Sequence, residues 1–120
     1  MKKRLVGVVV VVASALAAVS LAFAGSTTLK LDAAKASLAY NKKVLKAKTG
    51  KITISMLNTS PIFQHDVAIK INGKVHKGKT VGKNGVSKLT LTLKPGTYTF
   101  YCTVPGHAAA GMKGKLIVSK

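Results

Sequence analysis

Apolar and polar residues alternate along most of the chain after residue 26, with the period of two that half-buried β-strands produce. Ile52, Ile54 and Met56, for example, share one face of a predicted strand, and hydroxyl side chains stand between them. The alternation predicts short strands at 27–31, 37–40, 44–47, 51–58, 67–71, 89–93, 98–102 and 113–118. No segment among them has the period of an amphipathic helix, and Asp32–Ala36 is long enough for a single helical turn.

Turn signals separate these strands every dozen residues or so. Thr49-Gly50, Asn72-Gly73 and Pro95-Gly96 favour turns, and residues 58–61 interrupt a strand pattern. Residues 74–86 are rich in Gly and Lys and have little periodicity, so we interpret them as a loop or a weak edge strand. Seven or eight short strands with regular turns predict an all-β fold, an antiparallel β-sandwich of Greek-key type.

The first 24 residues follow a different pattern. A basic head at 1–4 precedes an apolar run at 5–23 that has no charge, and Ala22-Phe23-Ala24 forms a small-x-small exit. This order is typical of a secretory signal peptide. The apolar run is also long enough to cross a bilayer, so an uncleaved anchor is the alternative. We therefore expect a signal segment at 1–24, one domain at 25–120, and export to the periplasm or the extracellular face of the cytoplasmic membrane.

Lysine dominates the charged residues. The chain has 20 Lys and Arg against two acids, Asp32 and Asp66, for a net charge of +18. Without Lys2, Lys3 and Arg4, seventeen lysines remain against the two acids, a net charge of +15. We do not expect nucleic-acid binding, because this domain has no arginine for bidentate recognition and its lysines are spread along the chain.

Catalysis is not expected either. Two acids leave no carboxylate pair for acid–base chemistry, and the sequence shows neither a recognisable Ser/His/Asp set nor a glycine-rich phosphate loop. The lysine surface instead predicts partners that are acidic where they dock, because such a field attracts anionic molecules. We expect a monomer that meets a membrane only through the N-terminal segment, if that segment is retained.

Cys102, His107 and Met112 form the most informative motif. Four residues separate Cys from His and four separate His from Met, within one loop between two predicted strands. Soft sulfur donors with imidazole select copper, and a trigonal site of two His and one Cys with a long axial Met is the blue-copper geometry. Each residue alone also fits a plain structural role, in the core or in a turn. Their joint spacing around the lone cysteine of an exported domain favours a metal site.

The motif supplies one histidine, so a site of this kind needs a second. His65 stands at the head of the strand predicted at 67–71, after the break at Pro61, where a sandwich presents its loops. His76 lies in the segment rich in lysine and glycine, beside Lys77, where a surface histidine needs no further explanation. Placement therefore favours His65 over His76.

Residues 95–102, Pro-Gly-Thr-Tyr-Thr-Phe-Tyr-Cys, with the Pro-Gly-His and Gly-Met that follow, resemble the C-terminal motif of the cupredoxins, the plastocyanin and azurin family. Residues 58–69 are similar to the family's segment around its first ligand histidine, and the resemblance covers most of 29–118. It implies a cupredoxin-like fold and one type 1 copper ion that carries single electrons between redox partner proteins. The ligands that it implies are His65, Cys102, His107 and Met112.

The chain departs from the family's usual pattern in two places. The gap between Cys102 and His107 is longer than is usual in plastocyanins, so no one relative's reduction potential can be transferred. Many members have Asn directly after the first histidine, and this chain has Asp66. We hypothesise that the Asp66 carboxylate accepts hydrogen bonds from the backbone N–H or the hydroxyl of Thr103 and so braces the site.

Small residues surround His107, namely Pro105, Gly106 and the run 108–110. They predict a flat apolar patch on which redox partners dock weakly. Two other functions stay open. The same ligands suit an extracytoplasmic copper-handling or delivery protein, and a Cys102 that is merely buried would fit an immunoglobulin-like interaction module.

Overall fold

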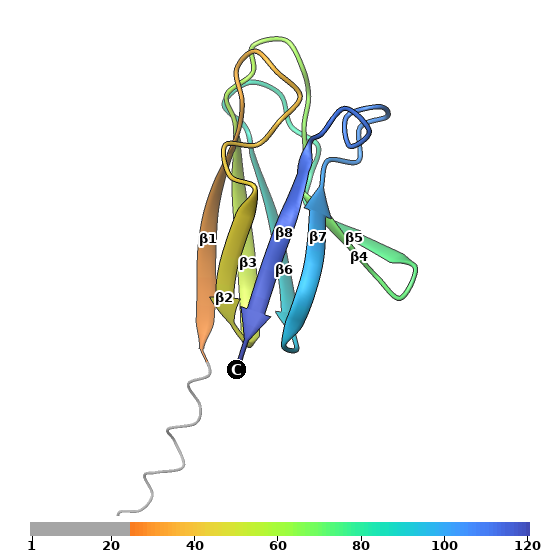
Figure 1. Ribbon diagram of the computed structural model, residues 1–120. Helices are drawn as coiled ribbons and strands as arrows, with labels where there is room; N and C mark the ends of the chain where they lie inside the picture. The colour runs from red at the N-terminus through yellow and green to blue at the C-terminus, as the bar shows by residue number, and fades with distance from the viewer. Residues whose placement is uncertain (1–24) are drawn as a thin grey trace, which may run out of the picture.

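The computed structural model describes residues 25–120, which form two β-sheets packed face to face (Figure 1). One sheet has the strand order β1–β3–β6, and the other has the order β2–β8–β7–β4–β5. The strands are β1 (Ser26–Ala33), β2 (Val44–Lys48), β3 (Gly50–Asn58), β4 (Ala68–Ile71), β5 (Lys74–Lys77), β6 (Val86–Leu93), β7 (Gly96–Tyr101) and β8 (Lys113–Ser119). The predicted signal peptide or anchor at 1–24 lies outside the described residues. Within residues 25–120, no helix has the length and hydropathy needed to cross a membrane.

The predicted all-β sandwich is confirmed, and seven of the predicted strands form. The prediction of a strand at 37–40 is wrong, because this segment contributes only an isolated bridge between Tyr40 and Ala33. Tyr40 is buried, and its hydroxyl donates to the Asp66 carbonyl at 2.6 Å. The apolar pattern of segment 37–40 therefore reflects the burial of one tyrosine ring and no strand pairing. The helical turn considered at Asp32–Ala36 does not form either, because β1 continues through Ala33. Part of segment 74–86, interpreted as a loop or a weak edge strand, forms the edge strand β5.

The sheets are mixed, which corrects the expectation of purely antiparallel pairing. β1 pairs with β3 in parallel, and β2 pairs with β8 in parallel, whereas the other ladders are antiparallel. After β1 the chain crosses to the other sheet to form β2, so β1 and β3 become neighbours that run in the same direction. Alternation along one strand reports which face is buried and carries no information about the direction of its neighbour.

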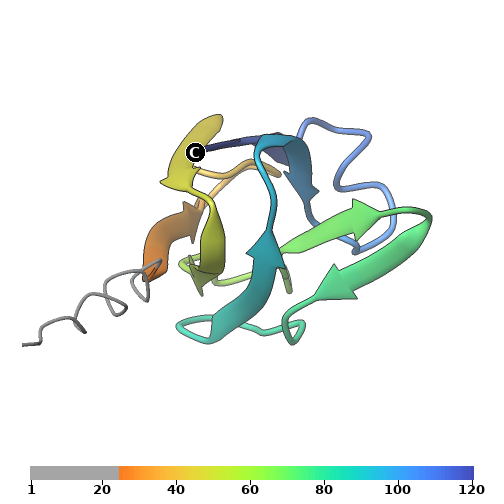
Figure 2. The same ribbon diagram turned by 90° about the horizontal axis from the view of Figure 1, so that it is seen from below.

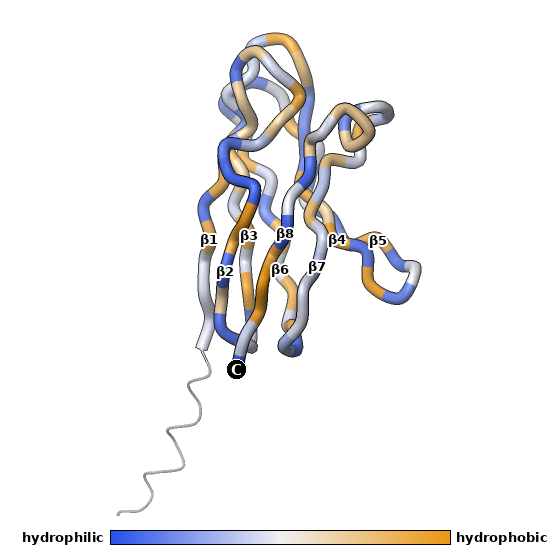
Figure 3. The backbone as a smooth tube through the Cα atoms, viewed as in Figure 1, coloured by the Kyte–Doolittle hydropathy of each residue, from blue (hydrophilic) through white to orange (hydrophobic). Residues whose placement is uncertain are grey.

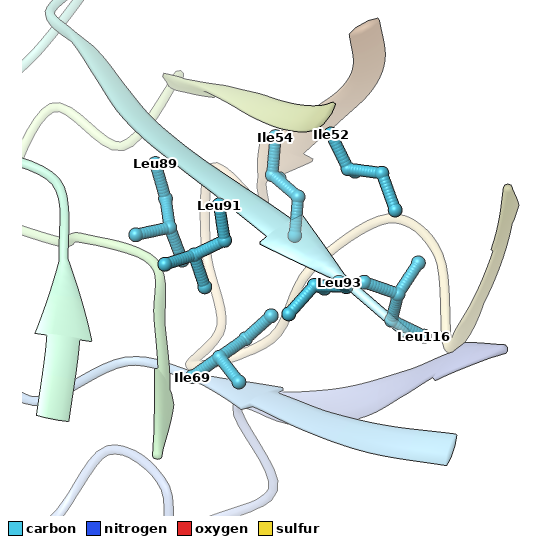
Figure 4. A pocket seen from close by; sticks show the side chains of 7 residues that line it. All are labelled: Ile52, Ile54, Ile69, Leu89, Leu91, Leu93 and Leu116. Carbon is cyan, nitrogen blue, oxygen red and sulfur yellow. The ribbon is translucent and has the colours of Figure 1, made fainter. Parts of the chain in front are cut away.

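Aliphatic side chains from both sheets fill the space between them. Figure 4 shows seven that point toward one another: Ile52, Ile54, Ile69, Leu89, Leu91, Leu93 and Leu116. The space that they enclose admits no water. Burial alternates strictly along β8, as expected for a strand with one face in the core. Figure 3 shows in addition a continuous apolar stretch in the second half of this strand. Burial of this kind is the main stabilising contribution to folding.

Two connections meet at the end of the sandwich opposite both ends of the described chain (Figure 1). One joins β3 to β4 and carries His65, and the other joins β7 to β8 and carries residues 102–112. The β4–β5 hairpin projects away from the remaining strands, as Figure 2 shows most clearly. Its turn has positive φ at Asn72 (49°) and Gly73 (81°), the conformation that an Asn-Gly hairpin favours. The fold therefore collects the predicted site residues at one end.

Candidate metal centre

Backbone pairing positions His65 at the base of the β3–β4 connection. Its N–H donates to the Val81 carbonyl at 3.0 Å, and its carbonyl accepts from the Val81 N–H at 2.9 Å. His65 lies just before β4, and this isolated bridge holds it next to the segment that follows β5. The His65 side chain is completely buried, so its orientation is set by the packed interior.

The β7–β8 loop presents the other three residues of the predicted site. Cys102 follows β7 directly, and its N–H donates to the Met112 carbonyl at 3.2 Å, which closes the loop at its base. The Met112 N–H donates in turn to the His107 carbonyl at 3.0 Å. These bonds make the loop compact and bring its ends together. Cys102 and Met112 are buried, and His107 is 7% exposed.

Three potential ligand atoms converge in this buried space. The Nδ1 atoms of His65 and His107 are 3.2 Å apart, and the Cys102 Sγ atom lies 3.9 Å from the first and 3.7 Å from the second. The structure thus brings together three of the four predicted residues in one cluster, all buried. His76 is in β5, paired with Ile69, and is not part of this cluster.

The triangle of donor atoms fits a metal ion. Zinc sites show the usual scale, with bonds of about 2.0 Å to imidazole nitrogen and about 2.3 Å to thiolate sulfur. A trigonal ion with such bonds would separate its two nitrogens by about 3.5 Å and each nitrogen from sulfur by about 3.7 Å. The observed separations are within a few tenths of an ångström of these values. Two imidazoles and one thiolate in a trigonal arrangement are the donors of a type 1 copper site.

Burial changes the acid–base behaviour of two of these groups. It lowers the pKa of His65, and the neighbouring His107 lowers it further, against an opposing effect of the Asp66 charge. It also raises the pKa of the Cys102 thiol, although hydrogen bonds from the Asp66 and Val104 backbones act in the opposite direction. A neutral imidazole is ready to bind a metal, whereas the thiol must first lose its proton. Metal binding is therefore expected to release a proton from Cys102.

The hypothesis of an Asp66–Thr103 brace is confirmed. The Thr103 N–H donates to Asp66 Oδ1 at 2.8 Å, and the Thr103 hydroxyl donates to Asp66 Oδ2 at 2.6 Å. Thr80 donates a further hydrogen bond to Oδ2 at 2.8 Å, and the Lys77 ammonium lies 3.5 Å from it. Burial alone would raise the pKa of Asp66, but these hydrogen bonds and the Lys77 charge outweigh it and lower that pKa. Asp66 therefore stays ionised and ties the His65 segment to the residue after Cys102.

The sequence did not reveal the hydrogen bonds that hold the β3–β4 connection in place. The buried Asn58 amide donates to the carbonyls of Phe63 and Val81 at 2.9 and 2.8 Å. Its Oδ1 accepts from the Ser60 N–H at 2.8 Å, and Ser60 Oγ accepts in turn from the Phe63 N–H at 2.9 Å. Asn and Ser beside a proline are turn residues whose side chains commonly bond to nearby backbone. That tendency was the available signal, but it does not identify the distant partner Val81.

Phe63 is the second feature that the sequence did not reveal. Its ring centroid lies 5.8 Å from that of His107, edge to face, and 6.2 Å from that of His65. Phe63 is 39% exposed and its neighbour Ile62 is 76% exposed. Two adjacent large apolar residues in a polar turn were a visible signal of an interaction surface. They add an apolar surface next to the least buried of the three clustered ligands.

Comparison with known proteins agrees with a copper site. Residues 27–119 match the family described as copper binding proteins, plastocyanin/azurin family. Plastocyanin of a Synechococcus species is 33% identical over an alignment of 101 positions, which covers 76% of this chain and 71% of that protein. Rusticyanin of Acidithiobacillus ferridurans is 51% identical over an alignment of 83 positions, which covers 56% of this chain, and the chain spans less than half (44%) of that relative.

The fold is also shared with solved structures. The crystal structure of dithionite-reduced auracyanin from Roseiflexus castenholzii superposes with a TM-score of 0.72 at 30% sequence identity, covering 80% of this chain and all of that one. The match includes both sheets, so it agrees with the eight-stranded architecture described above. The chain accordingly belongs to the plastocyanin/azurin family of copper binding proteins, the cupredoxins.

Proposed function

We propose that this protein is an exported single-electron carrier whose one type 1 copper ion is held by His65, Cys102, His107 and Met112. The observation that carries the proposal is the buried triangle of two Nδ1 atoms and one Sγ atom at trigonal spacing. Met112 enters the proposal because it is fully buried, follows the loop that carries His107, and is bonded through its carbonyl to Cys102. Its thioether would complete the type 1 donor set.

When bound, copper supplies one-electron chemistry by cycling between Cu(I) and Cu(II). The task of the chain is to keep its donors in one arrangement that serves both states. The Val81 bridge fixes the backbone of His65, and the Asp66 carboxylate fixes Thr103 after Cys102. Burial of all three clustered donors excludes water from the site. A held, dry donor set reduces the rearrangement that each electron transfer requires.

The surface near His107 supports a weak and rapid encounter with redox partners. His107 has the only exposed edge among the three clustered ligands, and Ala109 and Ala110 beside it are exposed. Phe63, whose ring meets the His107 imidazole edge to face, and its exposed neighbour Ile62 add further apolar surface. Small contacts without a large buried area allow quick release, as transient redox complexes need. Lysines elsewhere on the domain would steer partners that are acidic where they dock.

The proposed location rests on the sequence pattern of the first 24 residues. We assign residues 1–24 to a signal peptide, or to an uncleaved anchor, and residues 25–120 to the copper domain. The domain would then act in the periplasm or on the extracellular face of the cytoplasmic membrane, as a monomer. Its net charge argues against self-association, and it contains no arginine-based site for nucleic acid.

The test is the visible absorption of the purified domain after addition of Cu(II). We expect an intense blue charge-transfer band from the Cys102 thiolate, reversible colour loss on reduction, and no such band in Cys102→Ser. His76→Asn is the matched control, because it removes a histidine outside the cluster and should keep the blue colour. A colourless Cu(II) protein would overturn the proposal. Blue colour with poor redox cycling and rapid copper loss to an acceptor would favour copper delivery instead.

A further inference from the structure

A groove crosses the outer face of the five-stranded sheet, on the opposite side of β8 from the core. It has a volume of about 540 Å³ and is lined by Lys43, Val44, Thr99, Gly111, Lys113, Gly114 and Lys115. β8 forms its floor between β2 and β7, and Lys115 pairs with Val44 on one side and with Thr99 on the other. The volume is within the range of sites that hold small ligands or short peptide segments.

Three lysine side chains surround this groove. Lys113 and Lys115 project outward from β8 and are exposed. The Lys43 ammonium lies 3.4 Å from the Gly111 carbonyl and spans the groove's end near the copper loop. An ammonium group has three N–H donors, so Lys43 keeps donors for a ligand even while it contacts Gly111. The three charges repel one another, and an anionic group between them would relieve that repulsion.

The chain has no acidic side chain that can supply this anion. Its two acidic side chains are Asp32 and Asp66. Asp66 is completely buried and is engaged by Thr103, Thr80 and Lys77. Asp32 lies in β1, a strand of the other sheet. A second copy of so basic a chain is an equally poor source, because its charge has the same sign. The occupant must therefore come from a different molecule.

Apolar surface beside the lysines makes the groove better suited to some anionic ligands than to others. Val44 lines the groove beside the lysines and is 48% exposed. Ile117 (39% exposed) lies outside the lining, but it follows Lys115 on the same face of β8 and adds apolar surface next to the groove. A carboxylate segment with apolar residues satisfies both the ammonium groups and this apolar floor. A free phosphate leaves the apolar floor unused, and the groove contains no arginine, the residue that binds phosphate in bidentate fashion.

We propose that this groove is a docking site for an acidic, partly apolar segment of a partner protein. The inference deepens the proposed electron-carrier function, because it takes that partner to be a redox partner. Gly111 lines the groove and directly precedes Met112, and its carbonyl accepts the Lys113 N–H at 2.8 Å. A segment held here lies beside the loop that carries His107. The groove thus selects and orients a partner, whereas the apolar surface around His107 provides its closest approach to the copper.

The test uses the copper-loaded domain in its Cu(I) state and a blocked hexapeptide of alternating Glu and Leu as the probe. Binding is followed by NMR through the amides of Val44, Thr99 and Gly114, with a Gln–Leu peptide as the uncharged control. Lys113→Gln/Lys115→Gln removes two charges from the groove. Lys51→Gln/Lys88→Gln removes two exposed charges from β3 and β6, in the other sheet, and is the matched control. We expect the groove variant to weaken binding about tenfold more than the control variant.

Equal weakening in the two double variants would overturn the proposal, because it would mean that only net charge matters. The proposal also fails if inorganic phosphate or phosphatidylglycerol vesicles compete for the same amides more strongly than the peptide does. Val44→Asn gives a second check, since it keeps every charge and should still reduce peptide affinity. Reoxidation of each sample reports blue colour separately, so a failed groove and a failed copper proposal are distinguishable.

Discussion

Asp66 combines a structural and an electrostatic role in one buried side chain. Its two oxygens hold Thr103 and Thr80, and it lies directly after His65 in the chain. The Lys77 ammonium at 3.5 Å compensates part of its charge. A buried negative charge beside a copper site favours the more positive Cu(II) state, so Asp66 should lower the reduction potential.

Asp66→Asn tests that effect. The amide oxygen can still accept the Thr103 N–H, and the hydroxyls of Thr103 and Thr80 can rotate to accept from the amide nitrogen. Loss of the charge should raise the reduction potential by an amount on the order of 1 kcal/mol, or roughly 40 mV. Asp32→Asn is the control, because it removes the same charge from β1. Voltammetry that gives equal potentials for the two variants would exclude an electrostatic role for Asp66.

Asp66 should also shape the acid stability of the metal-free protein. Its folded-state pKa is lowered, so its contribution to stability is fully present above the unfolded pKa of about 3.9. That contribution is lost as the pH falls below this value and through the lower folded-state pKa. Guanidinium unfolding midpoints should therefore fall more steeply below pH ~4 in the wild type than in Asp66→Asn. Parallel curves for the two proteins would contradict the role assigned to this carboxylate.

At the scale of residues, the contact between Asp66 and Thr103 could be predicted from the sequence for a clear reason. Asp66 and Thr103 each stand directly after a predicted ligand, so their proximity followed from the predicted convergence of His65 and Cys102. Thr80 and Lys77 come from a segment whose composition has no periodicity, and nothing local indicated where it lies. The position of Lys77 depends on pairing of β5 with β4 in a hairpin whose second strand had no periodic pattern, and that of Thr80 depends on the long-range pairing of Val81 with His65.

At the scale of elements, β8 links the copper loop to the core through a close backbone contact. Gly114 lies inward between Lys113 and Lys115, opposite Phe100 of β7. A Cβ atom at this position would meet the Phe100 ring and would lie 2.6 Å from the Lys43 carbonyl. The same carbonyl accepts the Lys115 N–H at 2.8 Å, so it cannot move without breaking that bond. The strand that begins after Met112 therefore tolerates no side chain here.

Gly114→Ala is expected to destabilise the domain by about 1–3 kcal/mol, because the added methyl overpacks a filled space. Copper should also be released faster, since displacement of β8 moves the base of the loop that holds His107 and Met112. Gly82→Ala is the control, because a Cβ at Gly82 meets nothing within 4 Å. Urea unfolding and the rate of copper transfer to a chelator measure the two effects. Similar values for both variants would show that the close contact is relieved at no cost.

Strand prediction from the sequence succeeded where the alternation comes from a paired strand with one buried face. It failed where the alternation comes from the burial of a single side chain. The ladders of β3 and β6 bury every second residue against the same core, and their pattern was read correctly. The segment 37–40 has a similar pattern because Tyr40 packs against Phe100, with ring centroids 5.5 Å apart, while the rest of the segment makes no ladder. In a short segment, burial of a single ring and pairing of a strand give the same pattern of apolar and polar residues.

At the scale of the whole molecule, charge and fold are independent features. Seventeen lysines and two acids lie on residues 25–120, and one of the acids is buried. The composition correctly predicted a strongly positive surface, but only the folded chain collects three lysines around one groove. Long-range steering depends on the summed charge, whereas docking depends on the groove. The two contributions should therefore respond differently to salt and to substitution.

Oxidation of the Cu(I) protein by small charged reagents measures long-range electrostatic steering separately from docking in the groove. Ferricyanide is an anion and should react more slowly as ionic strength rises, because the screening length falls from about 30 Å at 0.01 M to about 10 Å at 0.1 M. A tris(phenanthroline) cobalt(III) cation meets the same positive field and should react faster under the same change. Stopped-flow rates should diverge at low salt by about tenfold or more and converge at high salt. Rates of the two reagents that stay constant with salt would mean that the lysine field does not reach the copper end of the molecule.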